Sequence, residues 1–415
     1  MRHVAEVPLA RPDFRLARNS QARPDAPYGP EQDAVLSAAD EEAARRSLTS
    51  WPGYAPTPLV SLTQLAEEAG VGSIHYKDES ERFGLGSFKA LGGAYAVARL
   101  LMAEAARRLD RDEPLSADAL DDAGTRPIVS EITVCCATDG NHGRSVAWGA
   151  QRFGCRCVIF VHATVSESRK QAIERFGAEV VRVEGNYDDS VRAAQEAASR
   201  NGWFVVSDTS YEGYMAIPRD VMAGYSVMAA EVLEQLAEPP THLFLQTGVG
   251  GMAAAVCAVF WRRFGAGRPK TVLVDPERAA CWWDSLAAGR PTAVAGELDT
   301  VMAGLACGEV SLLAWRILES GTDAVMTLPD AKAEACMRRL ADGGHDRPLV
   351  AGESAVAGLA ALLAAGKDEA ARALLGLSAD SRVLVIGTEG DTDPAIYEAI
   401  VGRPAAAVRA AAVTS

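Results

Sequence analysis

The chain has 415 residues, of which 48% are hydrophobic and 23% are charged. This length exceeds what a single small core needs and predicts two domains, and the composition is that of an ordinary globular protein. The net charge of −14 argues against nucleic acid or an anionic membrane surface as partners, because both attract basic patches.

Residues 1–35 are expected to form an irregular N-terminal extension. This segment has basic residues but lacks the continuous apolar stretch of a secretory signal, and no run in the sequence is long and apolar enough to cross a bilayer. The eight cysteines lack the spacing of zinc ligands, and Cys135 and Cys136 lie in an apolar, strand-like run. We therefore expect a protein of the reducing cytoplasm.

Beyond residue 50 the sequence alternates between short β-rich runs and longer segments with helical periodicity. Ser166 has the position of an N-cap at the start of one such helix, SESRKQAIERFGA. The alternation predicts an α/β fold with a mainly parallel sheet and helices on both faces, in which ligands bind at the loops that follow the strands. Strands are predicted at residues 134–137, 157–161, 180–183, 203–206, 242–246, 271–275 and 382–387, and helices at 143–154, 166–178 and 187–200.

The first candidate site is Lys89, at the start of a helical pattern in the segment KDESERFGLGSFKALGGAYAV. Its neighbours Phe88, Ala90 and Leu91 are apolar. A lysine in such surroundings can lose hydration, which lowers its pKa and makes it a nucleophile toward an aldehyde. The alternative is a solvated lysine on a helix face.

Two further loops lie between a predicted strand and a predicted helix. In TDGNHG, Thr138 to Gly143, Asn141 can donate a hydrogen bond and the helix amides can bind a carboxylate, while His142 is either a base or a structural histidine. In TGVGG, Thr247 to Gly251, the backbone amides can surround a phosphate. That loop lacks the spacing of a dinucleotide fingerprint or a P-loop, so a tight bend is the alternative.

The last predicted strand ends in IGTEGDTD, residues 386–393, where Thr388 offers a neutral hydroxyl. The acids Glu389, Asp391 and Asp393 that follow are either candidate metal ligands or a solvated loop. The sequence has no HxxE-type or cysteine-rich ligand set, so we predict no metal site and disfavour a metal-dependent hydrolase.

In this order, the entry segment YAPTPL at 54–59, SFK, T-x-GNHG, the glycine loop and the late strand ending in a hydroxyl residue resemble the tryptophan-synthase-β-like family. These are fold type II enzymes that use pyridoxal 5'-phosphate (PLP), and the similarity spans roughly residues 50–400. The resemblance implies two open, mainly parallel sheet domains with the cofactor in the cleft between them. The large PLP-binding domain is expected at 1–98 and 236–415, the small domain at 99–235, and the assembly is expected to be a homodimer.

The resemblance also implies roles for individual residues. Lys89 would hold PLP as a Schiff base, Asn141 would contact its 3'-oxygen, and Thr388 would face its pyridine nitrogen. The implied cofactor-binding residues are Phe88, Lys89, Asn141, Gly248, Val249, Gly250, Gly251, Met252 and Thr388.

Several stretches, including ERFGLGSFKALGG, ATDGNHGRSVAWGAQ, SDTSYEGY and GTEGDTD, are most similar to the diaminopropionate ammonia-lyases of that family. Related dehydratases usually carry serine at the position of Asp139, and a carboxylate there would offset the desolvation of a β-ammonium group. By resemblance, Asp139 is a candidate base for the D-isomer and Lys89 for the L-isomer; turn or strand-end capping is the alternative for Asp139 and Asp208. The predicted catalytic residues are Lys89, Asp139 and Asp208, and the predicted substrate contacts are Thr138, Asp139, Gly140, His142, Asp208 and Tyr211, with Tyr187 either lining the pocket or packing.

The function implied is PLP-dependent elimination of ammonia from a small amino acid, D- or L-2,3-diaminopropionate, which gives pyruvate and two ammonia. The alternatives are a serine, threonine or 3-hydroxyaspartate dehydratase on the same fold and a non-catalytic PLP-binding protein. Asp275-Pro276 departs from the Glu-Pro expected in the family. Cys281 and Cys307 are either a redox-sensitive pair or two free thiols.

Overall fold

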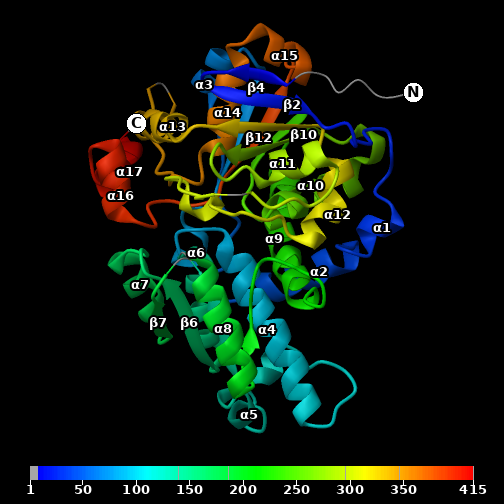
Figure 1. Ribbon diagram of the computed structural model, residues 1–415, viewed down its shortest axis with the longest axis vertical. Coiled ribbons are helices and arrows are strands. Elements are labelled where there is room, and N and C mark those ends of the chain that lie inside the picture. The colour runs from blue at the N-terminus through cyan, green and yellow to red at the C-terminus, as the bar shows by residue number, and fades with distance from the viewer. Residues whose placement is uncertain (1–7, 139, 186, 295, 345, 415) are drawn as a thin grey trace. The chain divides into compact units, whose positions relative to one another are not determined.

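The structure is a computed structural model that describes residues 8–138, 140–185, 187–294, 296–344 and 346–414 (Figure 1). The chain divides into two compact units. The large unit comprises residues 1–38, 56–81 and 228–415, and the small unit comprises residues 39–55 and 82–227. Lys89 therefore belongs to the small unit, and the glycine loop at 247–251 belongs to the large unit.

The sheet of the large unit has a parallel centre, β11-β10-β9-β12-β4. On one side β2 pairs with β11 and β1 pairs with β2, and on the other β3 pairs with β4, all antiparallel. Residues of the N-terminal extension thus add two strands to this sheet. The strands are β1 (Leu9–Arg11), β2 (Phe14–Arg18), β3 (Leu59–Ser61), β4 (Ser73–Asp78), β9 (His242–Gln246), β10 (Lys270–Pro276), β11 (Ala324–Leu328) and β12 (Arg382–Gly387).

Both faces of this sheet are covered by helices. Neighbouring residues of the central strand β9, such as Leu243 and Phe244, point to opposite faces, and both are fully buried. Helices α10 and α14, which are apolar over most of their circumference, lie in the interior. The helices of the large unit are α1 (Pro30–Asp33), α3 (Thr63–Ala69), α10 (Gly251–Phe264), α11 (Cys281–Ala288), α12 (Leu312–Gly321), α13 (Asp330–Asp342), α14 (Ala357–Gly366), α15 (Glu369–Leu375), α16 (Pro394–Val401) and α17 (Ala405–Thr414).

The small unit has a parallel sheet in the order β7-β6-β5-β8, with β8 at one edge. Its strands are β5 (Thr133–Ala137), β6 (Arg156–His162), β7 (Glu179–Val183) and β8 (Phe204–Val205). Its helices are α2 (Ala38–Thr49), α4 (Lys89–Arg108), α5 (Arg126–Ser130), α6 (Asn141–Phe153), α7 (Glu167–Glu174), α8 (Tyr187–Asn201) and the first part of α9 (Ala216–Gln235). Ser166 caps α7 by accepting a hydrogen bond from the Arg169 amide, as predicted.

In the small unit, α4 and the first part of α9 approach each other closely. A Cβ atom on Gly224 would lie 2.0 Å from the Leu91 carbonyl oxygen, and a Cβ on Gly92 would lie 2.4 Å from the Tyr225 ring. Because any Cβ at either position would clash, only glycine at both positions lets α4 and α9 approach this closely. The contact brings Tyr225 beside the first turn of α4, which begins at Lys89.

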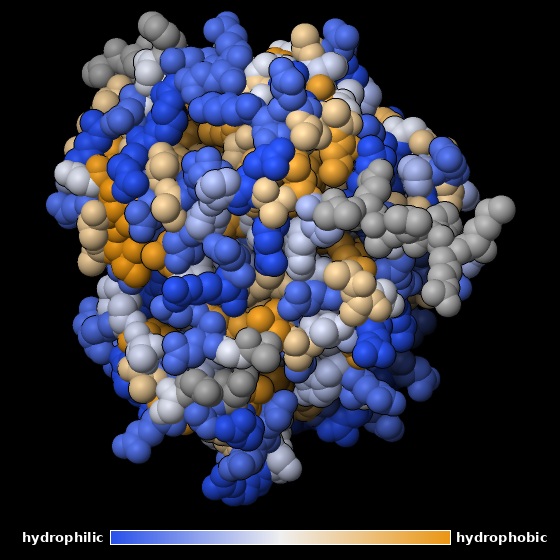
Figure 2. Space-filling view, turned by 45° about the horizontal axis from the view of Figure 1, so that its top comes forward, coloured by the Kyte–Doolittle hydropathy of each residue, from blue (hydrophilic) through white to orange (hydrophobic). Residues whose placement is uncertain are grey.

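The structure confirms the predicted α/β class, with two mainly parallel sheets. The face shown in Figure 2 is mostly hydrophilic, with small apolar patches scattered over it. Within the described residues, no helix combines the length and apolarity needed to span a membrane.

Candidate active site

Lys89 is the first residue of α4, directly after the N-cap residue Phe88. Its ammonium nitrogen lies 2.5 Å from Oδ2 of Asp208, and the two side chains are only 19% and 17% exposed. The same nitrogen is 5.5 Å from the ring centroid of Phe88 and 5.9 Å from that of Tyr225. Lys89 is therefore a partly buried amine among aromatic rings, with a carboxylate as its counter-ion, and not a solvated lysine.

Asp208 follows the short strand β8. Burial alone would raise the pKa of its carboxyl, but the Lys89 ammonium lowers that pKa to well below its usual range. Asp208 is therefore ionised at neutral pH and acts as a fixed negative charge beside the amine.

His142 lies in the first turn of α6, and its ring is buried. Nε2 is 2.8 Å from the Val206 carbonyl oxygen, which can only accept, so Nε2 carries the proton. Nδ1 lies 3.8 Å from Oδ2 of Asp208. Burial lowers the pKa of His142, and Asp208 only partly opposes this. His142 is thus a neutral imidazole that ties α6 to the segment carrying Asp208.

The other predicted residues of this loop lie at the N-terminus of α6. The Thr138 hydroxyl accepts hydrogen bonds from the amides of Gly140 and Gly143, at 3.0 and 3.1 Å, so it stabilises the start of the helix. Asn141 is the first helical residue. Asp139, predicted as a catalytic base, lies outside the described residues.

Two tyrosines follow Asp208 in the segment SDTSYEGY. Tyr211 is 42% exposed and stacks on Tyr214 at a centroid distance of 5.0 Å. The Tyr214 hydroxyl donates to the Val205 carbonyl at 2.8 Å and accepts from the Ser207 amide at 3.0 Å. Sequence reasoning missed Tyr214, which fixes the backbone just before Asp208. Tyr187, at the start of α8, is half-buried.

The glycine loop lies between β9 and α10, as predicted, and Trp282 packs against it. The Trp282 indole donates to the Gly248 carbonyl at 3.0 Å. Gly250 has φ +96°, and a Cβ there would lie 2.2 Å from the Trp282 ring. Val249 accepts from the Ser311 amide at 2.9 Å. These contacts fix the backbone of the loop just before the N-terminal amides of α10. Gly251 and the buried Met252 lie in the first turn of that helix.

Asp275, at the end of β10, joins this loop to α11. Its buried carboxylate accepts from the Thr247 hydroxyl at 2.5 Å and from the amides of Trp282 and Trp283 at 2.9 and 3.0 Å. Burial raises the pKa of Asp275 to about 7, although these three hydrogen bonds oppose the rise. This residue appeared in the sequence only as a departure from Glu-Pro, and its role was missed.

Thr388 follows β12 and is buried. Its hydroxyl accepts from the Gln246 side-chain amide at 3.2 Å, and that amide also donates to the Ile386 carbonyl at 2.7 Å. Gln246, the last residue of β9, was not among the predicted site residues.

Of the acids after Thr388, Glu389 and Asp393 are buried, and the partly exposed Asp391 forms an ion pair with Arg409 at 2.6 Å. Glu389 accepts from the Ser354 amide and the Thr392 hydroxyl, both at 3.1 Å, and Asp393 caps α16. Across the part of the chain that the structure describes, no group of three or more His, Cys, Asp or Glu residues could hold a metal.

Cys281 and Cys307 both lie beside Gly248. Cys281 Sγ is 3.5 Å from the Gly248 carbonyl oxygen, and Cys307 Sγ would be 2.9 Å from a Cβ on Gly248. Both are free thiols in the structure.

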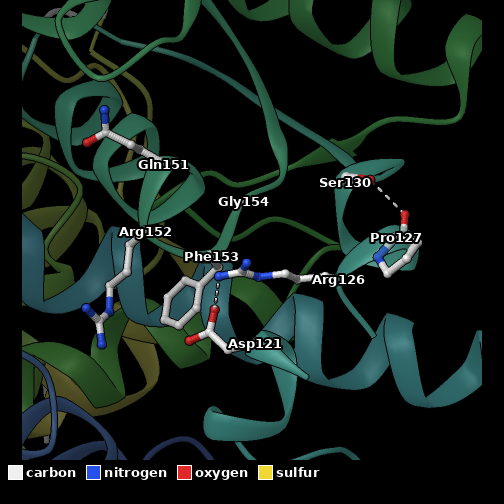
Figure 3. Close-up of a pocket in the computed structure, with 8 residues that line it drawn as sticks. All are labelled: Asp121, Arg126, Pro127, Ser130, Gln151, Arg152, Phe153 and Gly154. Atoms are coloured by element: carbon white, nitrogen blue, oxygen red, sulfur yellow. Dashed lines mark hydrogen bonds and ion pairs between the residues drawn. The ribbon is translucent and has the colours of Figure 1, made fainter. Parts of the chain in front are cut away.

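The small unit also contains a cavity of about 370 Å³ (Figure 3). In it Arg126 forms an ion pair with Asp121 at 3.5 Å. Arg152, at the C-terminal end of α6, lines it too; it lies about 15 Å along that helix from His142. None of the predicted site residues lines this cavity, whose lining residues are Asp121, Arg126, Pro127, Ser130, Gln151, Arg152, Phe153 and Gly154.

Known proteins resemble this chain over most of its length. A protein-family model described as "Pyridoxal-phosphate dependent enzyme" matches residues 50–389. Diaminopropionate ammonia-lyase of Salmonella typhimurium is 41% identical over 362 residues, which are 84% of this chain and 89% of that relative. The crystal structure of holo diaminopropionate ammonia lyase from Escherichia coli has a TM-score of 0.85 at 38% identity, covering 94% of this chain and 96% of that one. A second structure of the Escherichia coli enzyme, in complex with an aminoacrylate-PLP azomethine reaction intermediate, has a TM-score of 0.83 at 37% identity, with the same coverage.

Proposed function

The chain belongs to the pyridoxal-phosphate dependent enzymes of fold type II, and from this premise we propose that it eliminates ammonia from 2,3-diaminopropionate. The products are pyruvate and two ammonia. Relatives with this activity are about 40% identical over most of the chain. The structural observation that carries the proposal is the partly buried Lys89 amine, held 2.5 Å from the carboxylate of Asp208.

The residues present fit the cofactor. Bound PLP supplies an aldehyde that bonds covalently to an amine and a ring that accepts electrons from the substrate Cα. Lys89 is the amine that would bond to this aldehyde, with Phe88 packed beside it. The amides at the start of α10 would hold the phosphate, which the helix dipole favours. Thr388 would face the pyridine nitrogen, and its neutral hydroxyl favours protonation of that nitrogen less than a carboxylate would.

Charged and polar groups of the chain would handle the substrate and its protons. The ionised Asp208 attracts an ammonium group, which suits a substrate with two amines. Lys89, once its amine is free, would take the Cα proton of one isomer, and Asp139 that of the other. Asn141 would contact the cofactor 3'-oxygen, while Thr138, Gly140 and His142 would line the substrate side.

A substrate panel tests the proposed function. Purified protein with PLP is incubated separately with D- and L-2,3-diaminopropionate, serine and threonine, and 2-oxo acid formation is measured. We expect at least one diaminopropionate isomer to have a kcat/KM about tenfold or more above that of serine, because only its β-ammonium pairs with the site carboxylates. Faster turnover of serine or threonine would instead identify a dehydratase. An absorbance band at about 410 nm without any 2-oxo acid would identify a non-catalytic PLP protein.

By resemblance to the same family, we further propose that the chain forms a homodimer and that it works in the cytoplasm.

Removing the carboxylate of Asp275 should weaken PLP binding. In Asp275→Ala, two amides of α11 lose their acceptor and the Thr247 hydroxyl keeps only the Val274 carbonyl, which costs roughly 1–3 kcal/mol and loosens the start of the glycine loop. We expect PLP affinity, measured by fluorescence titration of the apoenzyme, to fall about tenfold. An unchanged affinity would contradict the proposed phosphate role of this loop.

Asp275→Asn is the matched variant for pH dependence. Its amide oxygen can still accept from the α11 amides, and its NH₂ can donate to Thr247 Oγ1, which also donates to the Val274 carbonyl. In the natural protein, PLP affinity should fall as pH rises through about 7, where Asp275 ionises and repels the phosphate. The titratable neighbours Asp284 and Cys281 add to this repulsion only as anions. The Asn variant should bind PLP nearly as tightly, with the fall between pH 6 and 8 removed.

A further inference from the structure

Tyr225, in the first part of α9, is a buried residue that the proposed function does not yet use. Its side chain is 1% exposed, and its hydroxyl is buried without a hydrogen-bond partner among the described residues. An unpartnered buried hydroxyl is unfavourable for stability, because its bonds to water are lost without replacement. Such a group calls for an explanation other than folding.

The position of Tyr225 points to Lys89. Its ring lies 4.6 Å from the ring of Phe88 and 5.9 Å from the Lys89 nitrogen, measured to the centroids. The close contact of α4 with α9, which Gly92 and Gly224 permit, fixes the ring in this place. Burial raises the pKa of the Tyr225 phenol well above its usual value, while the nearby Lys89 ammonium lowers it in part. The phenol is therefore neutral at physiological pH and is near enough to feel the charge of the amine.

An uncharged lysine amine has two N–H groups and one lone pair. Asp208 accepts one hydrogen bond from Lys89. The phenol oxygen of Tyr225 can accept a second, from another direction and another element of the fold. When Asp208 and Tyr225 each accept one of the two N–H groups, the orientation of the amine and therefore of its lone pair is fixed.

We propose that Tyr225 is a positioning residue that, together with Asp208, orients the lone pair of the Lys89 amine for bonding to the cofactor aldehyde and for taking the substrate proton. This inference rests on the proposed function and adds to it a residue that acts through Lys89. No proton leaves Tyr225 in this role, since its phenol only accepts a hydrogen bond. The titratable groups that face the amine within the described residues are Asp208, His142 and Tyr225.

The test compares Tyr225→Phe with the natural protein in the absence of substrate. Apoenzyme is mixed with PLP, and covalent bonding to Lys89 is monitored across a range of pH through the absorbance band at about 410 nm. We expect bonding to slow about tenfold, because the lone pair is no longer oriented. The pH at which bonding becomes fast should also move downward, because the ammonium form loses an acceptor that favours it. Phenylalanine keeps the packing, so the thermal midpoint should not fall.

Two controls separate positioning from damage to the pocket. Pyridoxamine 5'-phosphate has no aldehyde, so its affinity should be the same in both proteins. Tyr95→Phe removes another buried phenol of the small unit, near Arg99 and not near Lys89, and should leave the bonding rate unchanged. Equal rates and pH profiles for Tyr225→Phe and the natural protein would overturn the inference, as would an equal loss of pyridoxamine phosphate affinity. If the natural protein itself formed no bond at Lys89, the proposed function would fail with it.

Discussion

Lys89→Ala is expected to abolish turnover of diaminopropionate, with kcat at least about 10³-fold lower than in the natural protein. The substitution removes both the amine proposed to bond to the cofactor and the proposed base for one substrate isomer. Activity is measured as pyruvate formation with each isomer at saturating PLP. Retention of more than a few per cent of kcat would contradict the proposed role of Lys89.

The same experiment has a direct chemical readout. Borohydride reduction followed by mass spectrometry of peptides should find the cofactor on Lys89 of the natural protein and on no lysine of the variant. Lys89→Arg is the matched control, since it keeps a cation beside Asp208 but cannot bond to the aldehyde. We expect it to be as inactive as Lys89→Ala and more stable, because Asp208 keeps a partner.

Asp208→Asn is expected to lower kcat/KM by about 10²-fold or more. The amide has nearly the same shape as the carboxylate but cannot hold the Lys89 ammonium or attract the second amine of the substrate. Kinetics with D- and L-diaminopropionate measure the effect. Asp220→Asn removes the carboxylate that pairs with Arg99 elsewhere in the small unit and should leave the kinetics nearly unchanged. Loss of less than twofold in Asp208→Asn would contradict the assignment.

The same variant should change how stability depends on pH. The pKa of Asp208 is lowered in the folded protein, mainly because the attraction of the Lys89 ammonium outweighs the effect of burial. Its contribution to the free energy of unfolding is therefore present above its unfolded pKa of about 4 and is lost as pH falls below that value. We expect the thermal midpoint of the natural protein to fall more between pH 6 and pH 3 than that of Asp208→Asn.

Much of the fold could be predicted because each strand and helix leaves its own local pattern. The apolar runs HLFLQ and RVLVIG became β9 and β12, with ends at the predicted residues. The edge strands β1 and β3 have only three residues each, too few for an alternating pattern to stand out. In the N-terminal extension, β2 pairs with β11, which lies about 300 residues further along the chain, and β1 pairs with β2.

Candidate site residues could be predicted where they belong to a sequence motif. They could not be predicted where their positions depend on tertiary contacts. Lys89 and Asp208 are 119 positions apart, and no sequence spacing predicts that they form an ion pair. Resemblance named both residues, but only the folded chain brings them together. Asp275 and Tyr225 have no motif of their own, because their roles come from donors and rings on other segments.

The short strand β8 is an edge of the small sheet, where a strand of another molecule could pair with it. The Val205 and Val206 carbonyls just before Asp208 accept from the Tyr214 hydroxyl and the His142 ring. An incoming β-strand from another chain would find the Val205 carbonyl already occupied, whereas Val206 faces β5, to which its amide donates. The Tyr214 hydroxyl, which holds the backbone just before Asp208, thus also occupies an acceptor at this border, and we expect Tyr214→Phe to leave it more open to intermolecular β-pairing.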